Sequence, residues 1–240
     1  MNEENVFPIL LLIARPAAGK SEIIHYINSL SAQKRAISFH IGSLKSFDDF
    51  PFLWRWFEED MLLEKLGQER LYTDHNGYFK SAYLWDLLIN LINLDYQKYT
   101  LSETYSANTT ILIEFSRGKE HGGYRHALPL LSDEILENLS ILYVNVSWEE
   151  SLRKNRKRFN PEKPDSILEH SLPDEKLERL YRDCDFQELV DAPAGKVTIR
   201  DFQVPYVIFE NEDDVTSVMG TALGKRLEPL LQTLWSIRSA

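Results

Sequence analysis

Apolar residues are concentrated in five short runs along the chain. The runs are rich in isoleucine, valine, leucine and aromatic side chains, and polar residues interrupt them little. Strands that are covered on both faces of a parallel sheet have this pattern. We therefore predict five strands, at 7–14, 35–42, 109–115, 140–147 and 204–210.

Segments with apolar residues at helical spacing lie between these strands. Gly67 favours a helix end at its position, and Ser132 favours a helix start. Because strands and helices alternate, we expect an α/β fold of three layers, with helices on both faces of a mostly parallel sheet. We expect one domain over 1–240, with excursions at about 43–108 and 153–190. The helices are expected at 19–30, 50–67, 81–96, 131–139, 147–159, 172–190 and 214–235.

Composition and charge narrow the classes of function. Apolar residues make up 43% of the 240 residues and charged residues 27%, an ordinary globular balance. The formal net charge of −10 argues against broad binding to nucleic acid or to anionic membranes. A single cysteine, Cys184, excludes an intrachain disulfide and fits a reducing compartment. We expect a cytoplasmic protein without membrane association, and the sequence does not predict an oligomer.

The end of the first predicted strand leads through small residues into a helix. This order is the context of a phosphate-binding P-loop, in which successive backbone N–H groups and the helix N-terminus face the phosphate. In such a loop the lysine reaches the terminal phosphates of ATP and the next hydroxyl ligates Mg²⁺. An incidental Gly-Lys-Ser after a buried strand is the alternative. The segment consists of Ala14, Arg15, Pro16, Ala17, Ala18, Gly19, Lys20 and Ser21.

Two alanines of this segment occupy positions where related loops usually carry glycine. Alanine is tolerated where φ is negative and the neighbouring wall leaves room for a methyl group. We therefore predict negative φ at Ala14 and Ala17, and we expect Gly19 to be the loop residue least able to accept a side chain. A positive φ at either alanine would weaken the interpretation as a working phosphate site.

The segment Ala-Arg-Pro-Ala-Ala-Gly-Lys-Ser resembles the Gly-x-Pro-Gly-x-Gly-Lys loop of nucleoside monophosphate kinases. The resemblance lies at the level of the P-loop kinase superfamily, to which the deoxynucleoside kinases also belong. It implies an adenylate-kinase-like core with five parallel strands in the order 2-3-1-4-5. It covers the loop, the order of strands along the chain and, more weakly, the regions described next.

A carboxylate ends the third predicted strand, and an arginine follows three positions later: Glu114 and Arg117. Mg²⁺ takes oxygen ligands, often through water. A carboxylate at the tip of a strand beside a P-loop is therefore suited to the coordination shell of the ion. The stretch is similar to the strand, acid and arginine of adenylate and deoxynucleoside kinases, although its arginine is displaced. We expect Glu114 on the Mg²⁺ side or as a base, and Arg117 in contact with phosphate or substrate. A loop carboxylate paired with a neighbouring arginine is the alternative.

The stretch Arg-Lys-Asn-Arg-Lys-Arg concentrates positive charge in a chain whose net charge is negative. It resembles the lid of P-loop kinases, where arginines after the fourth strand close over the transferred phosphoryl group. Charge that develops on phosphate oxygens is stabilised well by planar guanidinium groups. The resemblance implies this role for Arg153, Arg156 and Arg158. A solvated helix face balanced by Glu149 and Glu150 is the alternative.

The resemblance places the acceptor in the excursion after the second strand. Aromatic side chains there could stack on a base or line a sugar pocket. Asp48 or Asp49 could act as base for a hydroxyl acceptor, and Arg55 could bind a phosphate. Asp49 and Trp54 loosely match an acid and a tryptophan of deoxynucleoside kinases. Three other aromatic residues at helical spacing are expected in the core: Phe52, Trp56 and Phe57.

Two further residues are candidate contacts. Arg125 lies in a loop that could touch the substrate, although a plain surface loop is the alternative. Asn211 follows the last predicted strand and resembles the asparagine that borders the adenine pocket in such kinases; otherwise it is a turn former.

Together these features predict a phosphotransferase that moves the γ-phosphoryl group of Mg-ATP to a small nucleoside, nucleotide or related metabolite. An ATP-hydrolysing switch, or a nucleotide-binding module that acts through a protein partner, is the alternative. A GTPase is not expected, because the chain has no Asn-Lys-x-Asp guanine motif.

Overall fold

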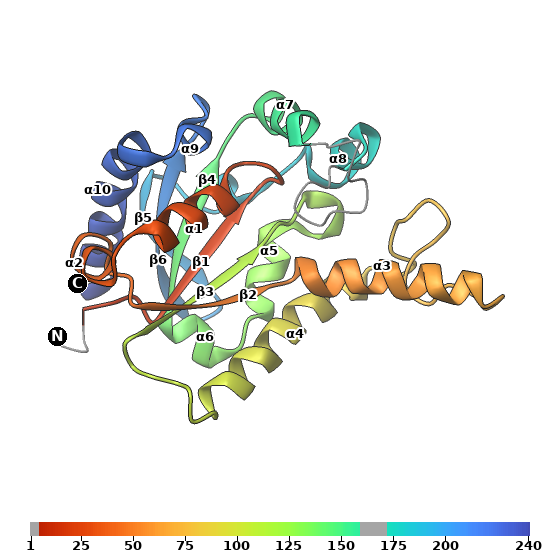
Figure 1. Ribbon diagram of the computed structural model, residues 1–240, viewed down its shortest axis with the longest axis horizontal. Coiled ribbons are helices and arrows are strands. Elements are labelled where there is room, and N and C mark those ends of the chain that lie inside the picture. The colour runs from red at the N-terminus through yellow and green to blue at the C-terminus, as the bar shows by residue number, and fades with distance from the viewer. Residues whose placement is uncertain (1–4, 159–171) are drawn as a thin grey trace.

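A six-stranded sheet forms the centre of the molecule (Figure 1). The structure is a computed structural model that describes residues 5–158 and 172–240. The strand order is β2-β3-β1-β4-β6-β5, with β5 antiparallel to β6 and every other neighbouring pair parallel. The strands are β1 (Ile9–Ala14), β2 (Ser43–Asp48), β3 (Thr109–Phe115), β4 (Leu139–Asn145), β5 (Ala194–Ile199) and β6 (Phe202–Glu210).

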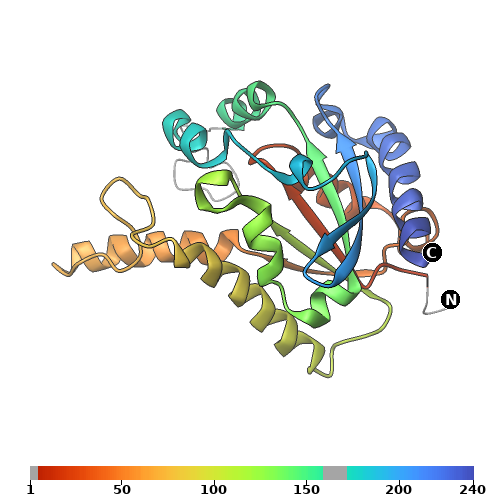
Figure 2. The ribbon, with the colours of Figure 1, turned by 180° about the vertical axis from the view of Figure 1, so that it is seen from behind.

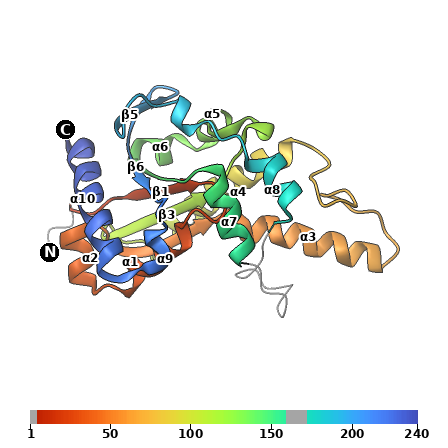
Figure 3. The ribbon, with the colours of Figure 1, turned by 90° about the horizontal axis from the view of Figure 1, so that it is seen from above.

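Helices cover both faces of the sheet, as Figures 2 and 3 show from two further directions. One face carries α1 (Lys20–Ser29), α2 (Ala32–Phe39), α9 (Val215–Val218) and α10 (Gly220–Ser239). The other carries α4 (Tyr83–Thr100), α5 (Gly123–Ala127) and α6 (Asp133–Asn138), with the short turns η1 (Lys119–His121), η2 (Leu128–Leu130) and η3 (Phe186–Glu188) nearby. Beyond the carboxyl ends of the strands lie α3 (Phe50–Lys65), α7 (Trp148–Arg158) and α8 (Asp174–Tyr181).

Strand β1 divides its side chains between two apolar cores. Ile9, Leu11 and Ile13 enter the core beneath α4, α5 and α6. The alternate residues enter the core beneath α1, α2 and α10: Leu10, Leu12 and Ala14. Because β1 is paired on both edges and covered on both faces, all six of its residues are buried. The predicted three-layer α/β class is therefore confirmed.

The prediction of a strand at 35–42 was wrong. Most of this stretch forms α2, which Ser31 caps by accepting a hydrogen bond from the N–H of Lys34 at 3.3 Å. The true second strand, β2, comes next and lies at an edge of the sheet, with only Phe47 buried. An edge strand needs few apolar residues, so a search for continuous apolar runs does not find it.

The sheet also differs from the predicted five strands in the order 2-3-1-4-5. β5 is the additional strand; it precedes β6 in the chain and pairs beyond it at the edge. Val197 and Ile199 are buried, while Lys196 and Thr198 are exposed. This short alternation is typical of a strand that is covered on one face only, unlike the continuous runs of the parallel strands.

Two predicted helices are shorter or interrupted. The helix expected at 172–190 ends at Tyr181, and the helix expected at 214–235 is divided into α9 and α10 at Met219, where φ is 57°. Of the excursion at 153–190, residues 159–171 lie outside the described residues. No helix in the described part of the chain combines the length and the hydropathy needed to cross a bilayer.

A buried carboxylate organises the segment between α3 and α4. Asp60 of α3 is fully buried and accepts hydrogen bonds from the N–H groups of Leu71 and Thr73, both at 2.6 Å, and from the Thr73 hydroxyl at 2.6 Å. Burial alone would raise the pKa of Asp60, but these hydrogen bonds lower it below its usual value. The charged carboxylate therefore holds the loop against α3.

We expect Asp60→Ala to lower the free energy of unfolding by about 2–4 kcal/mol, because the buried N–H and hydroxyl of Thr73 and the partly buried N–H of Leu71 lose their acceptor. Urea denaturation measures the global loss, and hydrogen exchange at Leu71 and Thr73 measures local opening. Glu64→Ala is the matched control on the same helix. Glu64 forms a partly exposed ion pair with Arg70 at 2.8 Å, so its loss should cost less than about 1 kcal/mol. Equal effects of the two substitutions would contradict the assignment.

Candidate phosphate-binding site

The loop between β1 and α1 is held through its carbonyl groups, of which that of Arg15 accepts the N–H of Ala18 within the loop at 3.3 Å. Three carbonyls accept hydrogen bonds from side chains that lie far away in the sequence. The bonds join Ala14 to the Tyr124 hydroxyl at 2.9 Å, Pro16 to the Ser151 hydroxyl at 2.9 Å, and Ala18 to the Asn211 amide at 2.8 Å. With these three carbonyls bonded elsewhere, the N-terminus of α1 is the main polar backbone group that the end of the loop offers to a ligand. This arrangement is suited to an anion.

Arg15 ties the loop to two further segments. Its guanidinium donates to the carbonyl of Val146 at 3.0 Å and to the carbonyl of Arg182 at 3.0 Å. The guanidinium is therefore bonded to backbone carbonyls. Any contact of Arg15 with a nucleotide, as predicted from the sequence, would be made by its main chain.

Gly19 is required by the geometry of the loop. Its φ is +114°, in the region that favours glycine. A Cβ at this position would lie 2.5 Å from the Thr216 hydroxyl and 2.8 Å from the Asn211 amide nitrogen. Within the loop, Gly19 is therefore the residue that cannot carry a side chain, as predicted.

Ala17 does not have the predicted conformation. Its φ is +58°, whereas Ala14 is extended within β1. A left-handed alanine costs roughly 1–2 kcal/mol because its Cβ approaches the following carbonyl oxygen. The prediction for Ala17 was wrong, and the strain weakens the view that alanine simply stiffens this loop. The side chains that anchor the neighbouring carbonyls hold the loop in place despite the strain.

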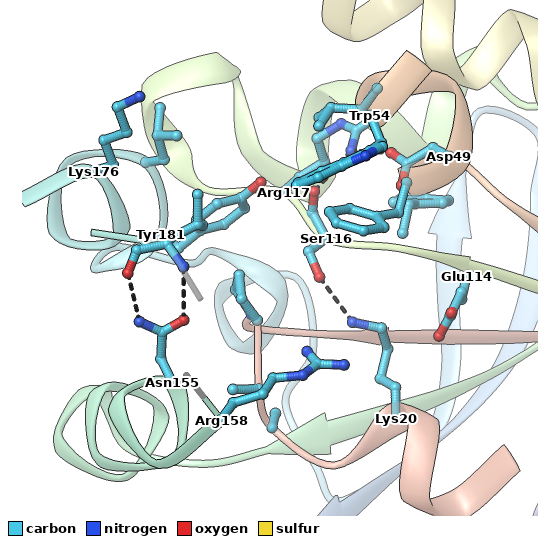
Figure 4. A pocket seen from close by; sticks show the side chains of 18 of the residues that line it. Lys20, Asp49, Trp54, Glu114, Ser116, Arg117, Asn155, Arg158, Lys176 and Tyr181 are labelled. Atoms are coloured by element: carbon cyan, nitrogen blue, oxygen red, sulfur yellow. Dashed lines mark hydrogen bonds and ion pairs between the residues drawn. The ribbon is translucent and has the colours of Figure 1, made fainter. Parts of the chain in front are cut away.

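A cavity of about 910 Å³ opens in front of the loop. Its walls are the loop, the carboxyl ends of β2 and β3, and helices α3, α7 and α8. Lys20 lies on its floor and donates to the Ser116 hydroxyl at 2.9 Å, as Figure 4 shows. Ser21 and Glu114 line the same cavity. The structure thus brings together the lysine, hydroxyl and carboxylate that the sequence singled out.

Two carboxylates face each other at the ends of β2 and β3. Asp48 and Glu114 are direct partners in the register of these parallel strands. Burial, together with the neighbouring carboxylates of Glu114 and Asp49, raises the pKa of Asp48 to about 8. Among the described residues, Oε2 of Glu114 is buried and has no hydrogen-bond partner. A bound cation, or a donor from a bound molecule, would stabilise this pair.

Arg117 is locked in place by its surroundings. It is 2% exposed and forms an ion pair with Asp49 at 2.6 Å. It also donates to the carbonyls of Ser116 at 2.7 Å and Trp85 at 3.2 Å, and its guanidinium lies 5.1 Å from the centre of the Trp85 ring. Both members of the pair line the cavity, but their charges offset each other. The alternative expected from the sequence, a carboxylate paired with a neighbouring arginine, is therefore met in part. The partner of Arg117 is Asp49, however, and not Glu114.

The predicted lid arginines point in different directions. Arg153 is paired with Glu150 at 2.6 Å and with Asp214 at 2.9 Å, and Arg156 is paired with Asp174 at 2.6 Å. Neither lines the cavity. Arg158 does line it and directs its guanidinium inward (Figure 4).

Other cations of α7 and α8 complete the basic wall of the cavity. The Lys154 ammonium is buried, with Asp214 at 2.6 Å and the Thr216 hydroxyl at 3.1 Å. Lys176 lies 5.3 Å from the centre of the Tyr78 ring, and burial lowers its pKa. The cavity residues Lys157 and Arg179 belong to the same two helices. The wall of α7 and α8 therefore carries most of the cationic side chains that line the cavity.

Of four other predicted site residues, one lines the cavity and three lie outside it. Trp54 lines the cavity, whereas Arg55 pairs with Glu58 and Glu59 outside it and Arg125 is exposed elsewhere. Asn211 is fully buried and outside the cavity lining, with its amide bound to Ala18 and to Thr216. Its place in the structure is behind the loop, where it supports the loop conformation.

Sequence analysis singled out Asn211, in another role, but not the two other residues that anchor the loop. Tyr124 and Ser151 each belong to ordinary helical segments, and no local pattern marks a side chain that bonds to a carbonyl more than one hundred residues away. Ser116 could have been noticed, because it follows the carboxylate at the end of β3 by two positions. Within the described residues, no group of three or more histidine, cysteine, aspartate or glutamate side chains is arranged to hold a metal ion.

Comparisons with known proteins place the fold. No protein-family model and no curated protein sequence matches the chain. Among solved structures, Kti12 from Chaetomium thermophilum in complex with ADP-AlF3 is similar, with a TM-score of 0.52, 12% identity, and coverage of 97% of this chain and 100% of that chain. An unliganded sugar kinase from Janibacter sp. HTCC2649 has a TM-score of 0.42 and 12% identity over 95% and 94% of the two chains. The first likeness shows that this chain and Kti12 share a fold.

We expect Ala17→Gly to stabilise the protein by about 0.5–1 kcal/mol, because relief of the left-handed alanine outweighs the added freedom of the unfolded chain. Ala18→Gly is the matched control. Ala18 lies outside the left-handed region and its methyl group is buried, so this substitution should destabilise. Thermal unfolding measures both variants. Loss of stability in Ala17→Gly equal to that in Ala18→Gly would contradict the strain at Ala17.

Proposed function

We propose that the protein is an ATP-dependent phosphotransferase that acts on a small-molecule acceptor. The observation that carries this proposal is the anchored loop: three outward carbonyls are held by distant side chains at the floor of a cavity that also contains Lys20 and Glu114. The fold shared with Kti12, whose structure contains ADP-AlF3, supports nucleotide binding by this fold.

The residues present fit a nucleoside triphosphate. The N-terminus of α1 faces the cavity, and Gly19 lets the loop pack closely against Thr216 and Asn211, where a Cβ could not be accommodated. Lys20 would contact the terminal phosphates when its ammonium leaves the Ser116 hydroxyl. Asn211 and Tyr124 would act indirectly, by keeping the loop in its anion-binding conformation.

The residues present also fit Mg²⁺. Ser21 and Glu114 would hold the ion together with phosphate oxygens, and the unpartnered Oε2 of Glu114 is the structural sign of such a role. When bound, Mg²⁺ neutralises charge that develops on the phosphate oxygens. Arg158 and Lys157 would add positive charge from the opposite wall, whereas Arg153 and Arg156 would leave existing ion pairs if they took part.

The size of the cavity favours transfer over simple hydrolysis. It extends from the loop past α3 to α8, which leaves room for a second molecule beside the phosphates. A site that only hydrolyses ATP needs room for no more than a water molecule at this place. The alternative remains an ATP-hydrolysing switch that acts with a protein partner.

We expect Lys20→Ala to weaken ATP binding and to lower ATP turnover by about 10²–10³-fold, because a charge that meets the reacting phosphates is lost. Fluorescent ATP-analogue titration and a turnover assay with labelled ATP measure the two effects. Lys34→Ala, which removes an exposed lysine from α2, should change neither. A Lys20→Ala protein with full affinity and turnover would refute the proposed function.

A further inference from the structure

We propose that the end of the cavity between α8 and the segment before α4 binds an oxyanion, with the Lys176 ammonium and the indole N–H of Trp85 as its main contacts. The oxyanion is a phosphate monoester or a carboxylate. Its assignment to the acceptor rests on the proposed function, and it names the substrate class: a metabolite whose anionic group lies away from the group that is phosphorylated.

Lys176 brings an unpaired positive charge to this end of the cavity. Its side chain is half-buried, and within residues 5–158 and 172–240 no carboxylate lies at ion-pair distance from its ammonium. Asp74 acts on this charge from farther away, and its Oδ1 already accepts the N–H groups of Asn76 and Tyr78, both at 2.9 Å. An ammonium that loses water without gaining an ion partner is destabilised. A bound oxyanion would supply that partner.

The ring of Tyr78 fixes the two cations of α8 that face this end. The Lys176 ammonium lies 5.3 Å from the centre of the ring, and the Arg179 guanidinium lies 4.2 Å from it. Arg179 also directs Nε and Nη2 to one oxygen of Glu120, at 2.8 and 2.7 Å. Glu120 therefore offsets the charge of Arg179, and the net positive charge of the group comes from Lys176.

Two ring nitrogens in the same region have no hydrogen-bond partner among the described residues. They are Nε1 of Trp85 and Nε2 of His121, whose rings stack with centres 4.5 Å apart and line the cavity. The ring of Trp85 also contacts that of Phe79, next to Tyr78 in the chain, with centres 4.9 Å apart. Trp85 is 6% exposed, and an indole N–H can only donate. A buried donor without an acceptor is unfavourable, and an oxyanion supplies acceptor oxygens.

This end of the cavity is separate from the loop between β1 and α1. Figure 4 shows Lys176 and Lys20 on opposite sides of the group of side chains, with Tyr181 between them. The group that receives the phosphoryl must lie beside the γ-phosphate, near Lys20. An anion held by Lys176 is therefore a part of the acceptor that does not react. Its binding energy would orient the acceptor along the cavity.

A titration with inorganic phosphate tests the site without any turnover. The protein is first saturated with Mg²⁺ and a non-hydrolysable ATP analogue, so that the loop is occupied. The indole N–H signal of Trp85 in the nitrogen-15 NMR spectrum, identified by its loss in Trp85→Phe, reports on the site. We expect a saturable shift of this signal, because a hydrogen bond to an anion changes its environment. Acetate replaces phosphate in a second titration. An unchanged signal with both anions would overturn the proposal.

Lys176→Met removes the charge and keeps an unbranched side chain against Tyr78. It should weaken phosphate binding by at least about tenfold, and Lys176→Arg should retain most of it. Lys65→Ala is the control, because Lys65 is exposed on α3 and outside the cavity lining. A purely structural Lys176 would change the thermal unfolding temperature but not the Kd for phosphate. Wild-type phosphate binding by Lys176→Met would therefore overturn the proposal.

The role in the acceptor is tested with labelled ATP and matched sets of molecules. One set is glycerol, glycerol 3-phosphate and glycerate; a second is ribose, ribose 5-phosphate and ribonate. We expect transfer to the phosphate or carboxylate members, with KM raised at least about tenfold by Lys176→Met and kcat little changed, because the group that Lys176 holds does not react. Transfer to the uncharged members at rates that Lys176→Met does not alter would overturn this inference and leave the proposed function standing. Release of inorganic phosphate without transfer to any member would overturn the proposed function and the acceptor role together, and the phosphate titration would still decide the anion site.

Discussion

Hydrogen bonds to the outer carbonyls of the loop after β1 are the constraint on which the rest of the site depends. A chain can gather N–H groups around an anion only if the carbonyls of the same peptides find partners elsewhere. In this protein the partners are Tyr124, Ser151 and Asn211, which belong to three separate segments. The loop also contains a left-handed alanine, so the surrounding fold must hold a conformation that the loop would not adopt alone.

Charge is divided between two walls of the cavity. The ends of β2 and β3 contribute carboxylates, and α7 and α8 contribute lysine and arginine side chains. Buried ion pairs keep several of these groups from meeting a ligand, most clearly Arg117 with Asp49. The sheet decides this division, because parallel strands place their carboxyl ends at one edge and the register sets Asp48 beside Glu114.

The buried strands of the sheet could be predicted from the sequence, whereas the two edge strands could not. β1, β3, β4 and β6 are continuous apolar runs, and each lies within or close to a predicted strand. β2 and β5 lie at the edges and bury few side chains, so they leave little trace in hydropathy. The stretch at 35–42 was also misjudged, because most of it belongs to a capped helix in which only Phe39 is buried.

The sequence by itself determined the class of the fold, the position of the loop between β1 and α1, and the residues Lys20, Ser21 and Glu114 that line one cavity with it. These follow from local order along the chain: a buried strand, a turn of small residues, a helix, and a later strand that ends in an acid. Only the tertiary structure decided which charged side chains face the cavity and which are paired. That choice depends on neighbours far apart in sequence, such as Arg117 with Asp49 and Asn211 with Ala18, and no local pattern encodes such contacts.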